Sequence, residues 1–160
     1  MLRKEFHVLV IEDSADEEKR IMAFLAKHMP GNRKLRIHWH RTVESGLRFL
    51  IGSHYDIQMI FCHDIQPARV ATAEERKTLS LVTERDERTS EVWRLMTCMS
   101  ALEMDRPLLI GLRSKIKGTL DLQRPQDYHG PVGFYVARHN AEAWSCVSDA
   151  VTELTFSAAA

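Results

Sequence analysis

The sequence predicts an α/β fold of three layers, in which helices cover both faces of a parallel β-sheet. Short apolar runs alternate along the chain with segments of helical periodicity, and this alternation is typical of consecutive βα units. A chain of 160 residues suits one compact domain. We expect that domain to span residues 1–156, followed at residues 157–160 by a tail or a cloning remnant that carries no function.

The first βα unit has clear boundaries. The apolar run HVLVI predicts a strand at residues 7–11. Ser14 and Glu17 then form a capping box, in which each side chain can bond a backbone N–H at the start of a helix. Apolar side chains follow at helical spacing until the Met-Pro-Gly sequence at residues 29–31, which ends the helix.

Four more strands and two more capped helices are expected along the chain. Thr42 caps a second helix that closes at residues 52–53, and Asn140 caps the last helix. Pro107 lies immediately before the fourth strand. The five expected strands cover residues 7–11, 35–40, 59–62, 108–112 and 132–137.

Two connections differ from a standard crossover. Roughly forty residues separate the third and fourth strands, whereas a crossover needs about a dozen. Thr72 and Glu75 form a capping box there, and helical spacing resumes at Trp93, so we expect an enlarged helical segment of one long helix or two. The glycines and proline of residues 114–130 predict that the fourth helix is short or absent.

Composition limits the classes of partner. Lys plus Arg and Asp plus Glu both number 22, so no net charge draws the protein to nucleic acid or to an anionic membrane. No apolar run is long enough for a membrane span or a signal peptide, and we expect a cytoplasmic protein. The three cysteines lie far apart without a CxxC motif, which predicts reduced thiols rather than disulfides or structural zinc.

Residues 6–57 resemble the first half of a bacterial response-regulator receiver domain. The similar features are the strand and acidic pair of FHVLVIEDS, the helix that follows, and the second helix, in HRTVESGLRFLIGSHYDI, which ends in a tyrosine–aspartate pair. The resemblance implies a flavodoxin-like fold with five parallel strands in the order 2-1-3-4-5. It also implies an active site at the carboxyl ends of those strands.

The acidic pair is the first part of that implied site. Phosphoryl chemistry there requires oxygen ligands for Mg²⁺, an attacking carboxylate, and hydroxyl and cationic groups nearby. Glu12 and Asp13 match the family's acidic pair and are the candidate Mg²⁺ ligands. Alternatively, these acids only complement the dipole of the first helix. The turn EDSADEE contains no glycine, which argues against a flavin or nicotinamide site.

The position of a phosphoacceptor is ambiguous. Counting forward from Tyr55 at the family spacing reaches Phe61, which cannot accept phosphate. One residue later is Cys62, in a sequence CHDI that resembles the family variant aspartate–histidine–aspartate–leucine. The sequence HDIQP resembles the family ending aspartate–isoleucine–glutamine–methionine–proline and nominates Asp64, with three extra residues before it. Either the acceptor is lost and Asp64 is a loop carboxylate near the site, or Asp64 is the acceptor.

Two further family positions are also altered. Strand four should end in serine or threonine, but the chain has Leu112 and Arg113 there, and Ser114 follows slightly late. Strand five should end in lysine–proline, but the chain has Arg138 and His139, and a guanidinium is no simple replacement for an ammonium. These changes indicate a degenerate member, and such pseudo-receivers signal through protein contacts or a bound ligand.

Two other histidine pairings are weaker candidates for a site. His38 and His40 lie on one face of a strand and could hold a metal, but no nearby residue completes that site. Cys62 and His63 are adjacent in a strand, so their side chains point to opposite faces and do not couple as nucleophile and base.

We therefore expect a receiver-like signalling domain that is deficient in phosphorylation and acts through protein contacts, not an enzyme. A histidine kinase, an output domain, another signalling protein or a second copy of the chain are the expected partners. The fifth strand with the last helix, or the long segment after strand three, would be the contact surface. The alternative is a conventional receiver phosphorylated on Asp64 with Mg²⁺. A small hydrolase or redox protein lacks a matching site in this sequence.

Overall fold

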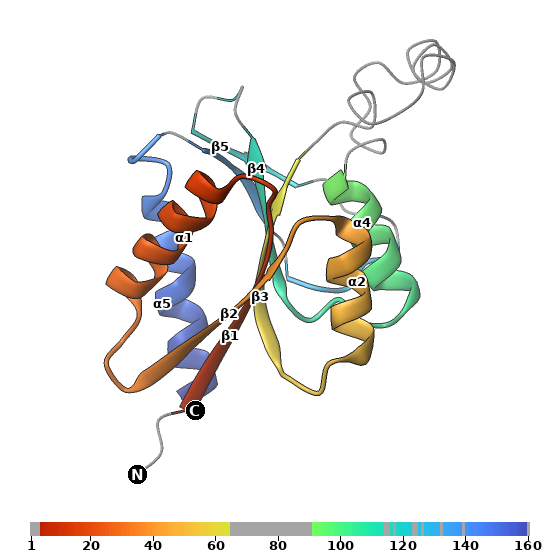
Figure 1. Cartoon of the computed structure of the whole chain (residues 1–160), viewed down its shortest axis with the longest axis horizontal. Helices are drawn as coiled ribbons and strands as arrows, with labels where there is room; N and C mark the ends of the chain where they lie inside the picture. The colour runs from red at the N-terminus through yellow and green to blue at the C-terminus, as the bar shows by residue number, and fades with distance from the viewer. Residues whose placement is uncertain are drawn as a thin grey trace.

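The computed structural model confirms an α/β fold of three layers. Its sheet is mostly parallel and has helices on both faces, which is roughly the flavodoxin-like arrangement (Figure 1). Thr72 and Glu75, the expected start of a helix after strand three, lie outside the described residues. The structure describes residues 4–64, 91–113, 116, 118–122, 125, 127–131, 133–138 and 140–159.

Four helices of the described residues cover the sheet, two on each face. α1 (Ala15–His28) and α5 (Ser145–Ala159) lie side by side on one face, and α2 (Val43–Gly52) and α4 (Glu91–Ala101) lie on the other (Figure 1). α4 confirms helical structure around Trp93, and α5 continues into the expected tail. None of the described helices is long and apolar enough to cross a membrane.

The helix starts follow the capping predictions in two cases out of three. The Ser14 hydroxyl accepts the Glu17 backbone N–H at 3.4 Å, and Thr42 accepts that of Ser45 at 3.1 Å. The last helix begins at Ser145, later than expected, because Asn140 instead caps a turn by accepting the N–H of Glu142 at 3.0 Å.

The sheet has six strands among the described residues, so the prediction of five in the order 2-1-3-4-5 was wrong. The five expected strands are present with ends shifted by a few residues, and a sixth, β5, pairs antiparallel with β6 at the edge. β5 is three exposed residues without an apolar run, so the sequence pattern could not reveal it. In the order β2-β1-β3-β4-β6-β5, the strands are β2 (Arg33–His40), β1 (Lys4–Ile11), β3 (Ile57–His63), β4 (Leu108–Arg113), β6 (Phe134–Ala137) and β5 (Thr119–Asp121).

The segment between β4 and β6 contains no helix among its described residues, in agreement with a short or absent fourth helix. The central strands β1, β3 and β4 are apolar on both faces, because each face packs against helices. Phe61 packs with α1 and α5, whereas the next residue, Cys62, packs on the α2 and α4 side. The carboxyl ends of the parallel strands meet at the top of Figure 1.

Gly111 is required by the packing of the Tyr135 ring. A Cβ atom at position 111 would overlap the Tyr135 ring in the buried layer between β4 and α4. We expect Gly111→Ala to lower the free energy of unfolding by about 1–3 kcal/mol in urea denaturation, because a close-packed core cannot yield to the added methyl group.

Gly52→Ala is the matched control, because nothing lies within 4 Å of the corresponding Cβ position at the end of α2. This control should lose no stability. Equal stabilities of the two variants would contradict the packing argument.

Candidate functional site

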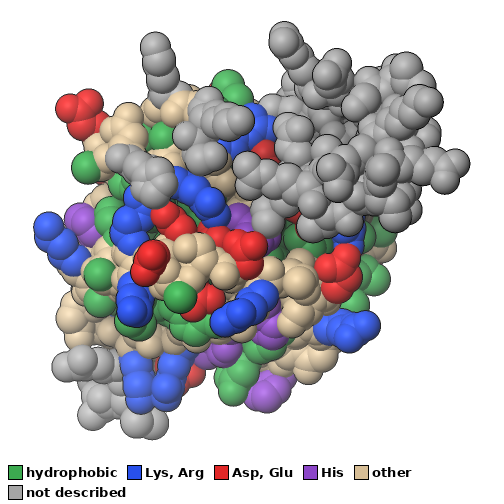
Figure 2. All heavy atoms as spheres, turned by 45° about the horizontal axis from the view of Figure 1, so that its top comes forward, with side chains coloured by type: hydrophobic (Ala, Val, Ile, Leu, Met, Phe, Trp, Pro, Cys, Tyr) green, Lys and Arg blue, Asp and Glu red, His purple; other side chains and the backbone are tan. Residues whose placement is uncertain are grey.

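Charged side chains gather at the carboxyl end of the parallel strands. Figure 2, with this end turned forward, shows acidic and basic side chains close together on that face, with histidine among them. The strand register explains why the side chains at these strand ends lie close together: Ile11 is paired with Cys62, and His63 with Leu112. Glu12 and His63 are therefore neighbours at the ends of β1 and β3.

Glu12, Asp13 and His63 form a group that we call the Glu-Asp-His cluster. One ligand atom from each lies within 4.8 Å of the other two. His63 Nδ1 lies 3.4 Å from Glu12 Oε1 and 3.3 Å from Asp13 Oδ1. Glu12 and His63 are buried, while Asp13 is exposed. The acidic pair thus faces an imidazole at the end of β3.

Glu12 is held as a carboxylate by donors from three parts of the chain. Its Oε1 accepts the backbone N–H groups of Asp13 at 3.1 Å and Ser14 at 3.2 Å, and Arg138 at the end of β6 pairs with Oε2. Burial alone would raise the pKa of Glu12, but the hydrogen bond with His63 and the charge of Arg138 outweigh it and lower the pKa to about 2.

Asp64 belongs to a different group of side chains. Its side chain is 2% exposed, and Arg113 Nε donates to its Oδ2 at 2.6 Å. The Arg113 guanidinium in turn lies 3.6 Å from the centroid of the Tyr135 ring. Asp64 is not among the ligands of the Glu-Asp-His cluster. Arg113 is thus the ion-pair partner of the Asp64 carboxylate.

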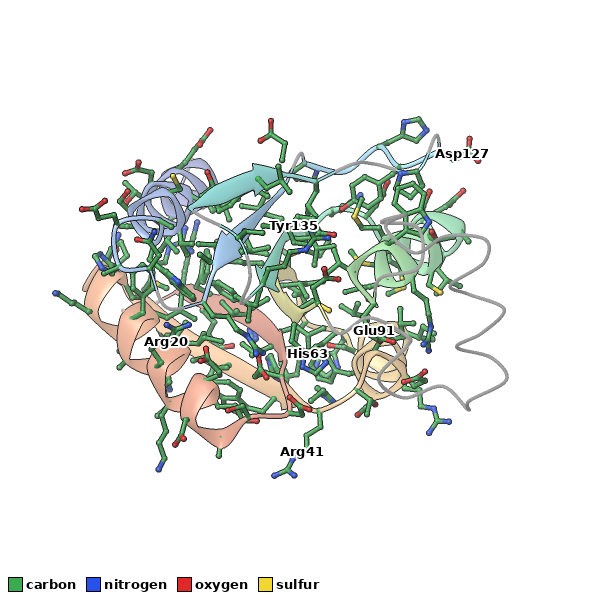
Figure 3. The ribbon with its side chains drawn as sticks, turned by 90° about the horizontal axis from the view of Figure 1, so that it is seen from above. Arg20, Arg41, His63, Glu91, Asp127 and Tyr135 are labelled. Carbon is green, nitrogen blue, oxygen red and sulfur yellow. The ribbon has the colours of Figure 1, made fainter. Side chains whose placement is uncertain are left out.

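Glu91 brings a further carboxylate to this end of the sheet. Figure 3 views the strand ends from above and shows Glu91, at the start of α4, beside His63. Burial raises the pKa of Glu91; the His63 charge opposes this shift and the Asp64 charge adds to it. Burial, with the charges of Asp64, Glu91 and Glu12, likewise raises the pKa of the Cys62 thiol well above its usual value, so this thiol is no ready nucleophile.

The remaining candidate residues lie apart from this site or outside the described residues. Phe61 is fully buried and stacks on Trp144, with the ring centroids 5.9 Å apart. Ser114 lies outside the described residues. His38 bonds His7 at 2.9 Å, and His40 bonds Ser45 at 2.6 Å. Neither His38 nor His40 belongs to a group of three potential metal ligands within the described part of the chain.

The donor set fits Mg²⁺ poorly. Mg²⁺ favours octahedral oxygen ligands, whereas the third ligand of the Glu-Asp-His cluster is an imidazole nitrogen. The binding of Mg²⁺ by Glu12 and Asp13 stays a prediction, and the structure adds a reason against it.

His63 is the residue of this site that the sequence analysis did not nominate. The family ending aspartate–isoleucine–glutamine–methionine–proline could have indicated His63, because its aspartate stands four residues before the proline. Four residues before Pro67 is His63, not Asp64. Asp64 was nominated instead, because an aspartate is the residue type expected of a phosphoacceptor.

Comparisons with protein-family models, with curated proteins and with solved structures found no match to this chain. The resemblance to receiver domains rests on the sequence motifs alone and stays a prediction. The geometry adds that Glu12 and Asp13 meet the end of β3 at the carboxyl edge of the sheet.

The ionised Glu12 stabilises the folded protein, and this contribution is lost in acid. Its pKa is about 2 in the folded protein against an ordinary 4.5, so the contribution is present above about pH 4.5 and disappears as the pH falls toward 2. Between about pH 6 and about pH 3, we expect the free energy of unfolding to fall by about 1–2 kcal/mol more in the wild type than in Glu12→Gln. Urea denaturation of the metal-free protein measures this difference.

Glu153→Gln is the control, because Glu153 is an exposed carboxylate on α5. It should keep the pH dependence of the wild type. Parallel stability curves for the wild type and Glu12→Gln would show that Glu12 does not carry this contribution.

Proposed function

We propose that the chain is a receiver-like signalling domain that works without an aspartyl phosphate, through contacts with other proteins rather than as an enzyme. The observation that carries this proposal is the position of His63 in the Glu-Asp-His cluster. The family resemblance requires a carboxylate beside the acidic pair at the end of β3. An imidazole occupies that place, and it cannot form an acyl phosphate.

The environment of Asp64 supports the same proposal. A carboxylate that attacks phosphorus must reach the phosphodonor in line with the leaving group. Asp64 is 2% exposed, and the Arg113 guanidinium holds one of its oxygens at 2.6 Å. Because the side chain is 2% exposed, a phosphodonor has little access to either of its oxygens, which opposes the reaction.

The surface formed by β6, β5 and α5 is the proposed contact region. β5 adds an exposed strand to the edge of the sheet beside β6, and its Leu120 is 45% exposed. A histidine kinase, an output domain, another signalling protein or a second copy of the chain are the proposed partners. The alternative contact surface, the long segment after β3, includes residues 65–90, which lie outside the described residues.

One observation favours the second candidate function, a conventional receiver phosphorylated on Asp64. The Asp64 Oδ1 atom is buried and has no hydrogen-bond partner among the described residues. This oxygen is the atom of Asp64 that remains available for a phosphoryl group if the surrounding chain opens.

Intact-protein mass spectrometry after incubation with Mg²⁺ and a small phosphodonor, such as acetyl phosphate, tests the proposal. We expect the wild type to gain no phosphoryl group. His63→Asp should gain one, because it places a carboxylate beside Glu12 and Asp13 at the end of β3.

Asp64→Asn separates the two candidate functions. An adduct on the wild type that Asp64→Asn abolishes would establish the second candidate and refute the proposal. Circular dichroism of each variant checks that the fold is kept.

A further inference from the structure

Two of the three separations within the Glu-Asp-His cluster match those between ligands of one metal ion. His63 Nδ1 is nearly equidistant from the two acids, at 3.4 Å from Glu12 Oε1 and 3.3 Å from Asp13 Oδ1. His63 Nδ1 and Glu12 Oε1 are within hydrogen-bond distance, but both separations are longer than the about 2.7–2.9 Å of a charge-assisted hydrogen bond. Ligand atoms bound about 2.0–2.2 Å from one metal ion lie about 3.0–3.5 Å from one another, and both separations fall in that range.

The imidazole distinguishes this cluster from a purely acidic one. The His63 side chain is 4% exposed, yet its Nδ1 faces the two carboxylates rather than solvent. A neutral imidazole nitrogen is a strong ligand for Zn²⁺ and other ions of the later first transition series, and a poor one for Mg²⁺. The residue that departs from the family pattern is thus also the residue that changes the metal preference.

We propose that Glu12, Asp13 and His63 bind a divalent transition-metal ion, such as Zn²⁺, in preference to Mg²⁺, and that His63 sets this preference. The inference rests on the proposed function in one respect, namely that His63 replaces a phosphoacceptor in this site. The bound ion would join the ends of β1 and β3.

The groups around the cluster suit such an ion. Arg138 holds Glu12 Oε2, and the backbone N–H groups of Asp13 and Ser14 contact Oε1, so the carboxylate is fixed before the ion arrives. Hydrogen-bonded partners of this kind orient the ligands of metal sites. Asp13 has a side chain that is 58% exposed, and it gives the ion access from solvent and leaves room for water as a fourth ligand.

Isothermal titration of the full chain with Zn²⁺, and separately with Mg²⁺, tests the proposal. We expect one Zn²⁺ site with an affinity at least about 100-fold higher than that for Mg²⁺. His63→Gln and Asp13→Asn should each weaken Zn²⁺ binding by at least about 10-fold, because each removes a ligand. Asp13 is exposed, so its substitution leaves the core intact even if His63→Gln fails to fold.

Two controls locate the site. His54→Gln removes an exposed imidazole outside the cluster and should leave the affinity unchanged. Mn²⁺, which thiolates bind weakly, should broaden the amide NMR signals of Asp13, Ser14 and Asp64 before others. His63→Asp should shift the preference toward Mg²⁺, since it supplies an oxygen ligand in place of nitrogen.

Three outcomes would overturn the inference: no Zn²⁺ binding, tighter binding of Mg²⁺ than of Zn²⁺, or Zn²⁺ binding that neither His63→Gln nor Asp13→Asn weakens. None of them bears on phosphorylation. A phosphoryl adduct on the wild type would refute the proposed function and leave the metal preference as measured, so the two failures are distinguishable.

Discussion

A buried carboxylate organises the carboxyl edge of this sheet. Glu12 is 0% exposed, and burying an unpaired charge costs several kcal/mol even after the surroundings relax. Its partners come from the loop after β1, from His63 on β3 and from Arg138 after β6. Because these partners come from three strand ends, the requirement to satisfy one charge fixes the relative positions of those ends.

The same edge holds two ion-pair groups, separated by the alternation of side chains along β3. Phe61 and Cys62 pack on opposite faces of the sheet, and the next two residues, His63 and Asp64, contact different partners. His63 meets the acidic pair, while Asp64 meets Arg113, which lies over Tyr135. Each buried acid is thus paired with a cation of the chain, Glu12 with Arg138 and Asp64 with Arg113.

Sequence patterns predicted most of the fold, because apolar runs and helix caps are local signals. Five of the strands, the Ser14 and Thr42 caps and the acidic pair were all visible without knowledge of neighbours in space. β5 was not, because three exposed residues pair only through their backbone. His63, the partner of the acidic pair, was not predicted either. Its position depends on the register between β1 and β3, which brings together residues about fifty positions apart.

That register contains an irregularity that counting along the sequence cannot detect. His7 pairs with Ile57 but Val8 pairs with Met59, so β3 carries one extra residue relative to β1 at this point. Such an irregularity displaces every later residue of the strand by one and exchanges the faces of its side chains. A displacement of one more residue would place Asp64 where His63 now lies. The residue that meets the acidic pair therefore depends on the number of residues that precede it in β3.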